Sequence, residues 1–178
     1  MHRRPGRALA AAGVVMLGLL APTTTAAAAP SHGPEASRGG VSSAAGEFVA
    51  SVDFTSLRTR DIGGAACEFT VDGSLTFSGA LEGVAVGTTT ALIFAPCAEA
   101  LASPPGTYVD VFAFDGRFTG EVGDQPASGP LRYAGVTRVG GGIDALITLR
   151  GRDAQAVLRA DAQVAVGGTY EGLSRARG

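Results

Sequence analysis

Three amino acids are missing from this 178-residue chain: it contains no Lys, no Asn and no Trp. Without lysine the chain cannot form a P-loop or a Schiff base, and without asparagine it has no N-glycosylation acceptor. Its two histidines, His2 and His32, both precede the segment that we expect to fold. A folded part without histidine holds no Ser-His-Asp triad, no Cys-His pair and no ordinary catalytic zinc site.

Other metal and cofactor motifs are also missing. A calcium site built from carboxylates stays open, but the sequence has no D-x-D-x-D-G loop. The run Gly140-Gly141-Gly142 lacks the strand, glycine spacing and helix of a nucleotide-binding loop. We therefore expect neither a metal ion nor another cofactor.

The first residues have the pattern of an export signal. Arg3, Arg4 and Arg7 form a basic start, residues 8–20 are an apolar run, and residues 26–29 are small, as a cleavage site requires. The apolar run is too short to span a bilayer comfortably. The pattern predicts a secreted, extracellular protein.

The chain divides into three expected parts. Residues 1–29 form the signal peptide. Residues 30–46 are rich in Pro, Gly and Ser and predict a disordered leader. Residues 47–175 remain as one domain, which is long enough to bury a core.

The expected mature protein is acidic. Three of the 14 basic residues lie in the signal, so 11 basic residues remain against 16 acidic ones. This balance argues against nucleic acid or an anionic membrane as a partner. No later stretch of about 18 apolar residues predicts stable membrane insertion. The sequence leaves the oligomeric state open.

Cysteine occurs twice, at Cys67 and Cys97. An even count in an exported chain predicts a disulfide, and a loop of this length would stabilise the fold by roughly 3–4 kcal/mol. A reactive thiol pair is the competing interpretation. It has less support, because the spacing is far from C-x-x-C and no cation is adjacent to either residue.

Apolar residues alternate with polar ones from Phe48 nearly to the end, which is typical of strands with one buried face. The longest alternation runs from Cys67 to Glu82. A change of parity at Glu82-Gly83 predicts a two-residue turn there, after which Val84, Val86, Thr88, Thr90, Leu92 and Phe94 face inward. This register puts Cys67 opposite residue 98, so a bulge at Ala95-Pro96 would bring Cys97 to it.

Later strands continue the pattern after an expected loop over residues 98–105. Tyr108, Asp110, Phe112, Phe114 and Phe118 share one face, and the return strand carries Leu131, Tyr133 and Val139 on one face and Arg132 and Arg138 on the other. The last strand is expected over residues 154–170.

No segment after the signal shows helical periodicity. About eight long strands without a covering helix predict an all-β, antiparallel up-and-down barrel, which we prefer over a two-sheet sandwich.

Two segments resemble a known family. They are residues 114–123, with the sequence FDGRFTGEVG, and residues 167–173, with the sequence GGTYEGL. These glycine and aromatic placements are similar to those of allene oxide cyclase-like and dirigent-like barrels, which include actinobacterial secreted members of unassigned function. The resemblance covers about residues 65–174 and implies the barrel fold. No catalytic residue of the cyclases matches a position in this chain.

The inward positions are mostly apolar, so an open barrel would bind a small apolar molecule that its few polar groups orient. The candidate ligand-binding residues are Asp110, Tyr108, Phe112, Phe114, Tyr133 and Tyr170; Thr88 and Thr90 are further inward polar positions. Asp110 could act as an acid, a base or a polar anchor, or could simply be solvated at the barrel mouth. Three functions stay open: a ligand-binding module, a cyclase or isomerase acting on an apolar substrate, and an extracellular interaction or envelope protein. Whether the chain is an enzyme is undecided.

Overall fold

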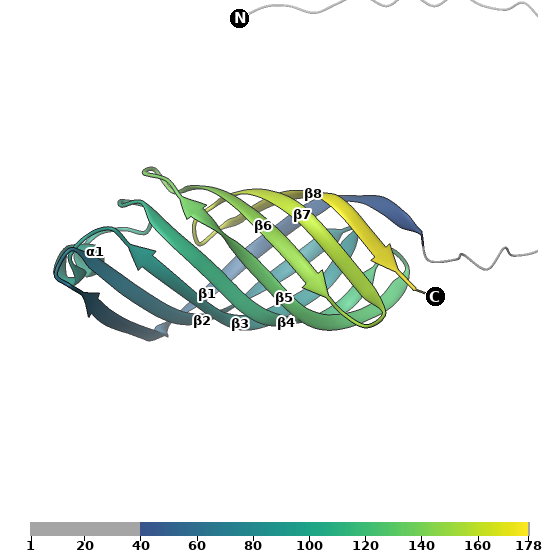
Figure 1. Ribbon diagram of the computed structural model, residues 1–178, viewed down its shortest axis with the longest axis horizontal. Coiled ribbons are helices and arrows are strands. Elements are labelled where there is room, and N and C mark those ends of the chain that lie inside the picture. Colours follow the sequence, from purple (N-terminus) through teal and green to yellow (C-terminus); the bar gives the residue numbers. More distant parts are fainter. Residues whose placement is uncertain (1–39, 178) are drawn as a thin grey trace, which may run out of the picture. The chain divides into compact units, whose positions relative to one another are not determined.

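A computed structural model describes residues 40–177 and shows a closed antiparallel barrel (Figure 1). The elements are β1 (Val41–Ile62), β2 (Ala66–Gly79), β3 (Leu81–Ile93), α1 (Cys97–Ala102), β4 (Asp110–Val122), β5 (Gln125–Thr137), β6 (Gly142–Arg150), β7 (Ala154–Gln163) and β8 (Gly167–Ala176). Each strand pairs with the next, and β8 pairs with β1. The predicted all-β, eight-stranded barrel is therefore confirmed. The expected signal peptide lies outside the described residues.

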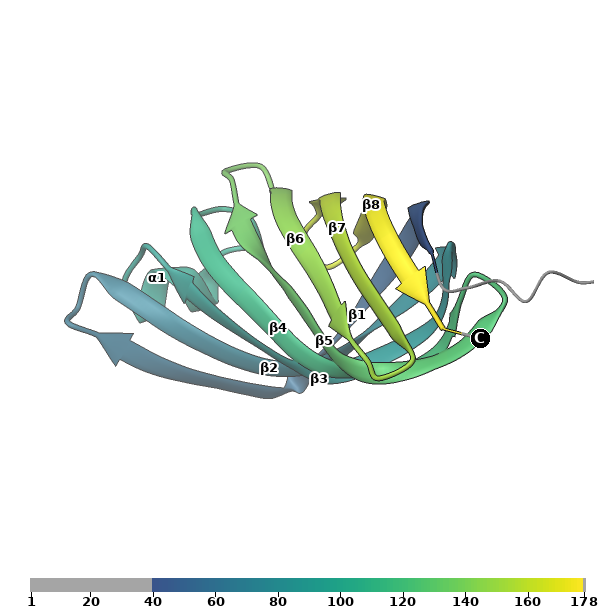
Figure 2. The same cartoon turned by 45° about the vertical axis from the view of Figure 1, so that its right-hand side comes forward.

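The domain begins earlier than expected. β1 starts at Val41, within the segment predicted to be a leader, and Ala44 is already buried in the core. From Val41 to Val49 the strand pairs with β8, so these residues close the barrel. Beyond Ala50, β1 pairs only with β2 among the described strands, and the two form an arm that extends past the closed part of the barrel (Figure 2).

The register between β2 and β3 differs from the prediction. Phe77 pairs with Gly83 and Cys67 pairs with Ile93, so the chain turns at Ala80 and not at Glu82-Gly83. The inward face of β3 therefore consists of Leu81, Gly83, Ala85, Gly87, Thr89, Ala91 and Ile93. The residues predicted to face inward face outward instead, and Val86 is 64% exposed.

The cause of this error lies in β4. Ala85, Thr89 and Ala91 of β3 stand directly opposite Phe118, Phe114 and Phe112. Small inward residues on one strand make room for large rings on the next, so the more apolar face of β3 is not the buried one.

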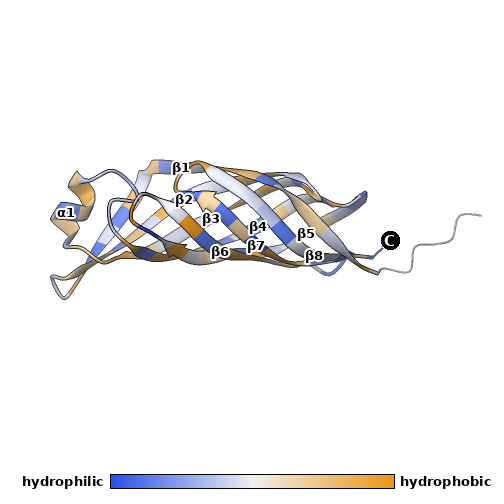
Figure 3. Ribbon diagram, turned by 90° about the horizontal axis from the view of Figure 1, so that it is seen from above, coloured by the Kyte–Doolittle hydropathy of each residue, from blue (hydrophilic) through white to orange (hydrophobic). Residues whose placement is uncertain are grey.

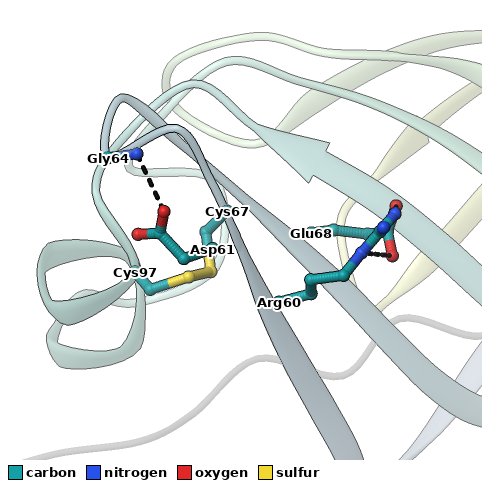
Figure 4. Close-up of a disulfide and its surroundings, with 6 residues drawn as sticks. All are labelled: Arg60, Asp61, Gly64, Cys67, Glu68 and Cys97. Carbon is teal, nitrogen blue, oxygen red and sulfur yellow. Dashed lines mark hydrogen bonds and ion pairs between the residues drawn. A yellow bond between two sulfur atoms is a disulfide. The ribbon is translucent and has the colours of Figure 1, made fainter.

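The predicted disulfide between Cys67 and Cys97 is confirmed, although the predicted pairing around it is not. Cys97 is the first residue of α1, a short helix in the segment where a loop was expected. The two Cα atoms lie 4.8 Å apart, and the bond ties α1 to β2 (Figure 4). On the outer surface beside it, the Arg60 guanidinium donates to both carboxylate oxygens of Glu68.

Two smaller differences concern the last strands. Residues 154–170 are not one strand, because β7 ends at Gln163 and a turn with Ala165 in the left-handed region precedes β8. Val139 lies in the β5–β6 turn and is 71% exposed, so it does not share the buried face of Leu131 and Tyr133.

Hydrophilic and hydrophobic residues are mixed along the strands of the barrel (Figure 3). Arg132 lies on the outer face of β5, as predicted, and pairs with Asp115 of β4 at 2.7 Å. Arg138 follows the last residue of β5 and is therefore not part of that strand; it pairs with Asp144 of β6 at 2.5 Å. Neither ion pair contributes much to stability, because all four side chains are well exposed. Within residues 40–177, no helix has the length and apolar character needed to cross a membrane.

Candidate functional site

The interior of the barrel contains a cavity of about 290 Å³ at the end that carries α1. It is lined by the β1–β2 arm, by the inner faces of β3, β4 and β5, and by the segment from Ala100 to Tyr108. Its volume lies near the lower end of the range of about 300–1,000 Å³ that is typical of small-molecule sites. The lumen is therefore not packed solid.

Aromatic rings form a continuous contact path into the cavity. The ring of Phe48 contacts Phe77 of the packed core at a centroid distance of 5.7 Å and Tyr133 at 5.4 Å. Tyr133 in turn meets Phe112 edge to face at 5.0 Å. Phe48, Phe112, Phe114 and Tyr133 all line the cavity, which gives it a largely apolar wall.

The position of the Phe114 ring depends on a neighbouring glycine. Gly116 follows two residues later on β4, and a Cβ at that position would lie 2.6 Å from the Phe114 ring. The missing side chain lets the ring lie along the strand. A substitution at Gly116 would push Phe114 further into the cavity.

The hydroxyl of Tyr133 is the most unusual polar group in this site. Tyr133 is 5% exposed, and its hydroxyl oxygen is buried without a hydrogen-bond partner among the described residues. Burial raises the pKa of the phenol, so the group stays protonated and acts as a hydrogen-bond donor. A buried hydroxyl without a partner costs free energy.

Asp110 begins β4 on the cavity wall and is 8% exposed. Burial raises the pKa of its carboxyl to about 6, and a hydrogen bond from the Thr137 hydroxyl acts in the opposite direction. Thr137 lies directly opposite on β5 and is itself buried. Asp110 is thus held in the wall, not solvated at the mouth.

Tyr108 lies in the segment that leads from α1 to β4. It lines the cavity and is half-buried, and its hydroxyl lies 3.4 Å from a carboxylate oxygen of Glu99 on α1. The disulfide connects the start of α1 to β2, and the Gly140 amide in the β5–β6 turn donates to the Gly106 carbonyl of the covering segment at 2.9 Å. The covering segment of the cavity is therefore tied down at two points.

Tyr170 lies away from the cavity. Its hydroxyl accepts a hydrogen bond from the Leu81 amide at 2.8 Å and donates to the Ser78 carbonyl at 2.9 Å, which fastens β8 to the β2–β3 turn. Burial raises the pKa of Tyr170, and the Leu81 hydrogen bond opposes that shift. Its role is structural. The other five candidates, Asp110, Tyr108, Phe112, Phe114 and Tyr133, all line the cavity.

Some cavity residues were missed by sequence reasoning. Thr137 shares the inward parity of Leu131 and Tyr133, so the pattern on β5 could have identified it. Thr89 lines the cavity in place of Thr88 and Thr90, because the register of β3 differs from the prediction. The bulge in β1 between Asp53 and Arg58 brings Phe54 and Leu57 to the cavity, and no sequence signal marks it.

Two comparisons with known proteins found no relative of this chain. No family model matches the chain, and no curated protein matches it. Within residues 40–177, no cluster of three or more His, Cys, Asp or Glu side chains is suited to hold a metal ion. The apolar cavity and the polar side chains on its wall are therefore the basis for the proposed function.

Proposed function

We propose that this chain is an exported barrel that binds a small, largely apolar molecule in the cavity beneath α1. The apolar wall of this cavity, on which Phe48 and Phe112 both contact Tyr133, carries the proposal. Such a wall favours apolar ligands through their removal from water, and the few polar side chains on it give them an orientation. Export is proposed from the signal-like sequence of residues 1–29, and the disulfide is consistent with an oxidising compartment.

Filling the cavity tests this proposal. Ala91 lines the cavity on β3, and its neighbour Thr90 points outward and is exposed. N-phenyl-1-naphthylamine, an apolar dye that is uncharged at neutral pH, should fluoresce on binding the wild-type protein. Ala91→Phe should weaken its binding at least about tenfold, which corresponds to the loss of one to two buried methylene contacts.

The matched control is Thr90→Phe, which adds the same ring to the outer face of the same strand. It should bind the dye as the wild type does. The proposal fails if the wild-type protein does not bind the dye, or if Ala91→Phe binds it unchanged while remaining folded.

A second candidate function rests on Asp110. A carboxyl group with a pKa of about 6 in an apolar cavity suits acid–base chemistry near neutral pH. The resemblance to allene oxide cyclase-like barrels supports a cyclase or isomerase that acts on an apolar substrate held inside the barrel. Under this proposal Asp110→Asn abolishes turnover without lowering the melting temperature. A variant that retains turnover would exclude this function.

A further inference from the structure

The charged side chains on the cavity wall are all acidic. Among the lining residues, Asp72 and Asp110 are acidic and none is Arg, Lys or His. Asp72 is exposed, and it accepts a hydrogen bond from the Thr88 hydroxyl at 2.7 Å. An anionic ligand would therefore lose its hydration on entry without meeting a cation in the wall, which is unfavourable.

Asp110 is the buried one of these two acidic residues, and its capacity to accept hydrogen bonds is largely unused. The Thr137 hydroxyl is its one hydrogen-bond partner within residues 40–177. Its strand neighbours on both sides, Ile93 of β3 and Thr137 of β5, are uncharged. Since a carboxylate offers about four acceptor positions, most of them are free for a ligand.

Asp110 and Tyr133 stand at different depths in the cavity. Tyr133 pairs with Phe114, which is four residues beyond Asp110 on β4. At about 3.3 Å per residue, this separates the two levels by roughly 13 Å along the strand. The aromatic side chains of Phe112 and Phe114 occupy the wall between them. A ligand with one polar end at Asp110 would thus lay its apolar part along these rings.

We propose that the cavity selects apolar amines: the ammonium group pairs with Asp110, the hydrocarbon body lies against Phe112 and Phe114, and carboxylates are rejected. This inference rests on the proposed ligand-binding function and names the chemical class of the ligand. The pairing is a charge-assisted hydrogen bond in a poorly hydrated site, which is stronger than a neutral one.

Three ligands with the same hydrocarbon chain test the inference: octylamine, octanol and octanoate. Each is titrated into the full chain at about pH 7.5, with displacement of N-phenyl-1-naphthylamine as the readout. Octylamine should bind at least about tenfold more tightly than octanol, as expected when one charge-assisted hydrogen bond is added. Octanoate should be the weakest of the three.

Asp110→Asn should remove the advantage of octylamine and leave the affinity for octanol within about twofold. The control is Asp72→Asn, which removes the exposed acid of the lining and should preserve the order of the three ligands.

The outcomes separate this inference from the proposed function. If octanol binds but octylamine binds no better, or if octanoate equals octylamine, the amine preference is wrong while the ligand-binding function stands. Persistence of the preference in Asp110→Asn would also overturn the inference. If none of the three ligands displaces the bound dye, the amine preference is wrong while the ligand-binding function stands; if the dye itself does not bind, both proposals fail.

Discussion

Similar apolar residues lie at both ends of the barrel, but they fill the lumen at one end and surround a cavity at the other. At the end farthest from α1, Phe118, Leu81 and Leu158 have no exposed surface, and side chains from all eight strands fill the lumen. At the end near α1, phenylalanines and a tyrosine surround about 290 Å³ of empty space. Phe48 lies between the two and contacts rings on both sides. One half therefore provides stability, and the other half can hold a ligand.

The largest difference in stability is expected between alanine substitutions of two phenylalanines of β4, one in the packed half and one at the cavity. Phe118→Ala should lower the free energy of unfolding by about 3–5 kcal/mol, because it leaves a void in a packed core. Phe112→Ala should cost less than half of that, because the ring is only partly buried and already borders empty space. Urea unfolding of both variants measures the difference. Equal losses would show that the two halves are equally well packed.

Removal of the disulfide is expected to have the next largest effect. The double substitution of Cys67 and Cys97 by Ser should cost roughly 3–4 kcal/mol, because the unfolded chain regains the freedom of the closed loop. The same change releases α1 from β2, so hydrogen exchange should increase in α1 and the end of β2 more than in the packed half. An increase spread evenly over the barrel would contradict the division into two halves.

The pH dependence of stability should identify Asp110. Its pKa in the folded state is about 6, above the ordinary value of 3.8, so the folded protein holds this proton more tightly than the unfolded chain does. Its contribution to stability is therefore largest below about pH 4 and decreases as the pH rises through about 6. Relative to Asp110→Asn, the wild type should lose about 1–3 kcal/mol between about pH 4 and about pH 7.

Chemical unfolding of both proteins at several pH values measures this difference. Asp124→Asn, in the exposed turn between β4 and β5, serves as the control. A constant difference between wild type and Asp110→Asn across this pH range would contradict the burial of Asp110.

The smallest changes in stability are expected at two tyrosines: one has a hydroxyl with hydrogen-bond partners, and the other has a hydroxyl with none among the described residues. Tyr170→Phe should cost about 1–3 kcal/mol, because the Leu81 amide would remain buried without its acceptor. Tyr133→Phe should leave stability unchanged or raise it by about 1 kcal/mol, because it removes a buried hydroxyl that has no partner among the described residues. Thermal unfolding distinguishes the two. A large loss for Tyr133→Phe would mean that its hydroxyl is satisfied in solution.

The sequence predicted β4 correctly because large rings alternate there with outward residues, at Phe112, Phe114 and Phe118. It failed for β3, where the outward face carries Val84 and Val86 and the inward face carries Ala and Gly. The information that corrects this error lies on another strand, in the rings opposite Ala85 and Ala91. Periodicity within one segment cannot contain it.

The candidate site was predictable to a similar degree. Asp110 and Tyr133 were identified because polar side chains are rare at inward positions. Their distinct chemistry, one free donor and one free acceptor at different depths, depends on the register between β4 and β5. The cavity itself depends on how the β1–β2 arm and the segment after α1 enclose it, which is a property of the assembled fold.

The arm of β1 has a consequence for how a ligand enters. Over Ser51–Asp53 and Arg58–Ile62 the strand pairs with β2, and among the described strands no other pairs with its outer edge. The β2 side of the arm is fixed, because β2 also pairs with β3 and the disulfide ties it to α1. The outer edge of β1 is therefore the side of the mouth that no β-ladder closes. The charged side chains of Arg58, Arg60 and Asp61 along this edge disfavour pairing with a second molecule. A ligand that enters along this edge breaks no β-ladder of the described strands, so the barrel can exchange its ligand while it stays folded.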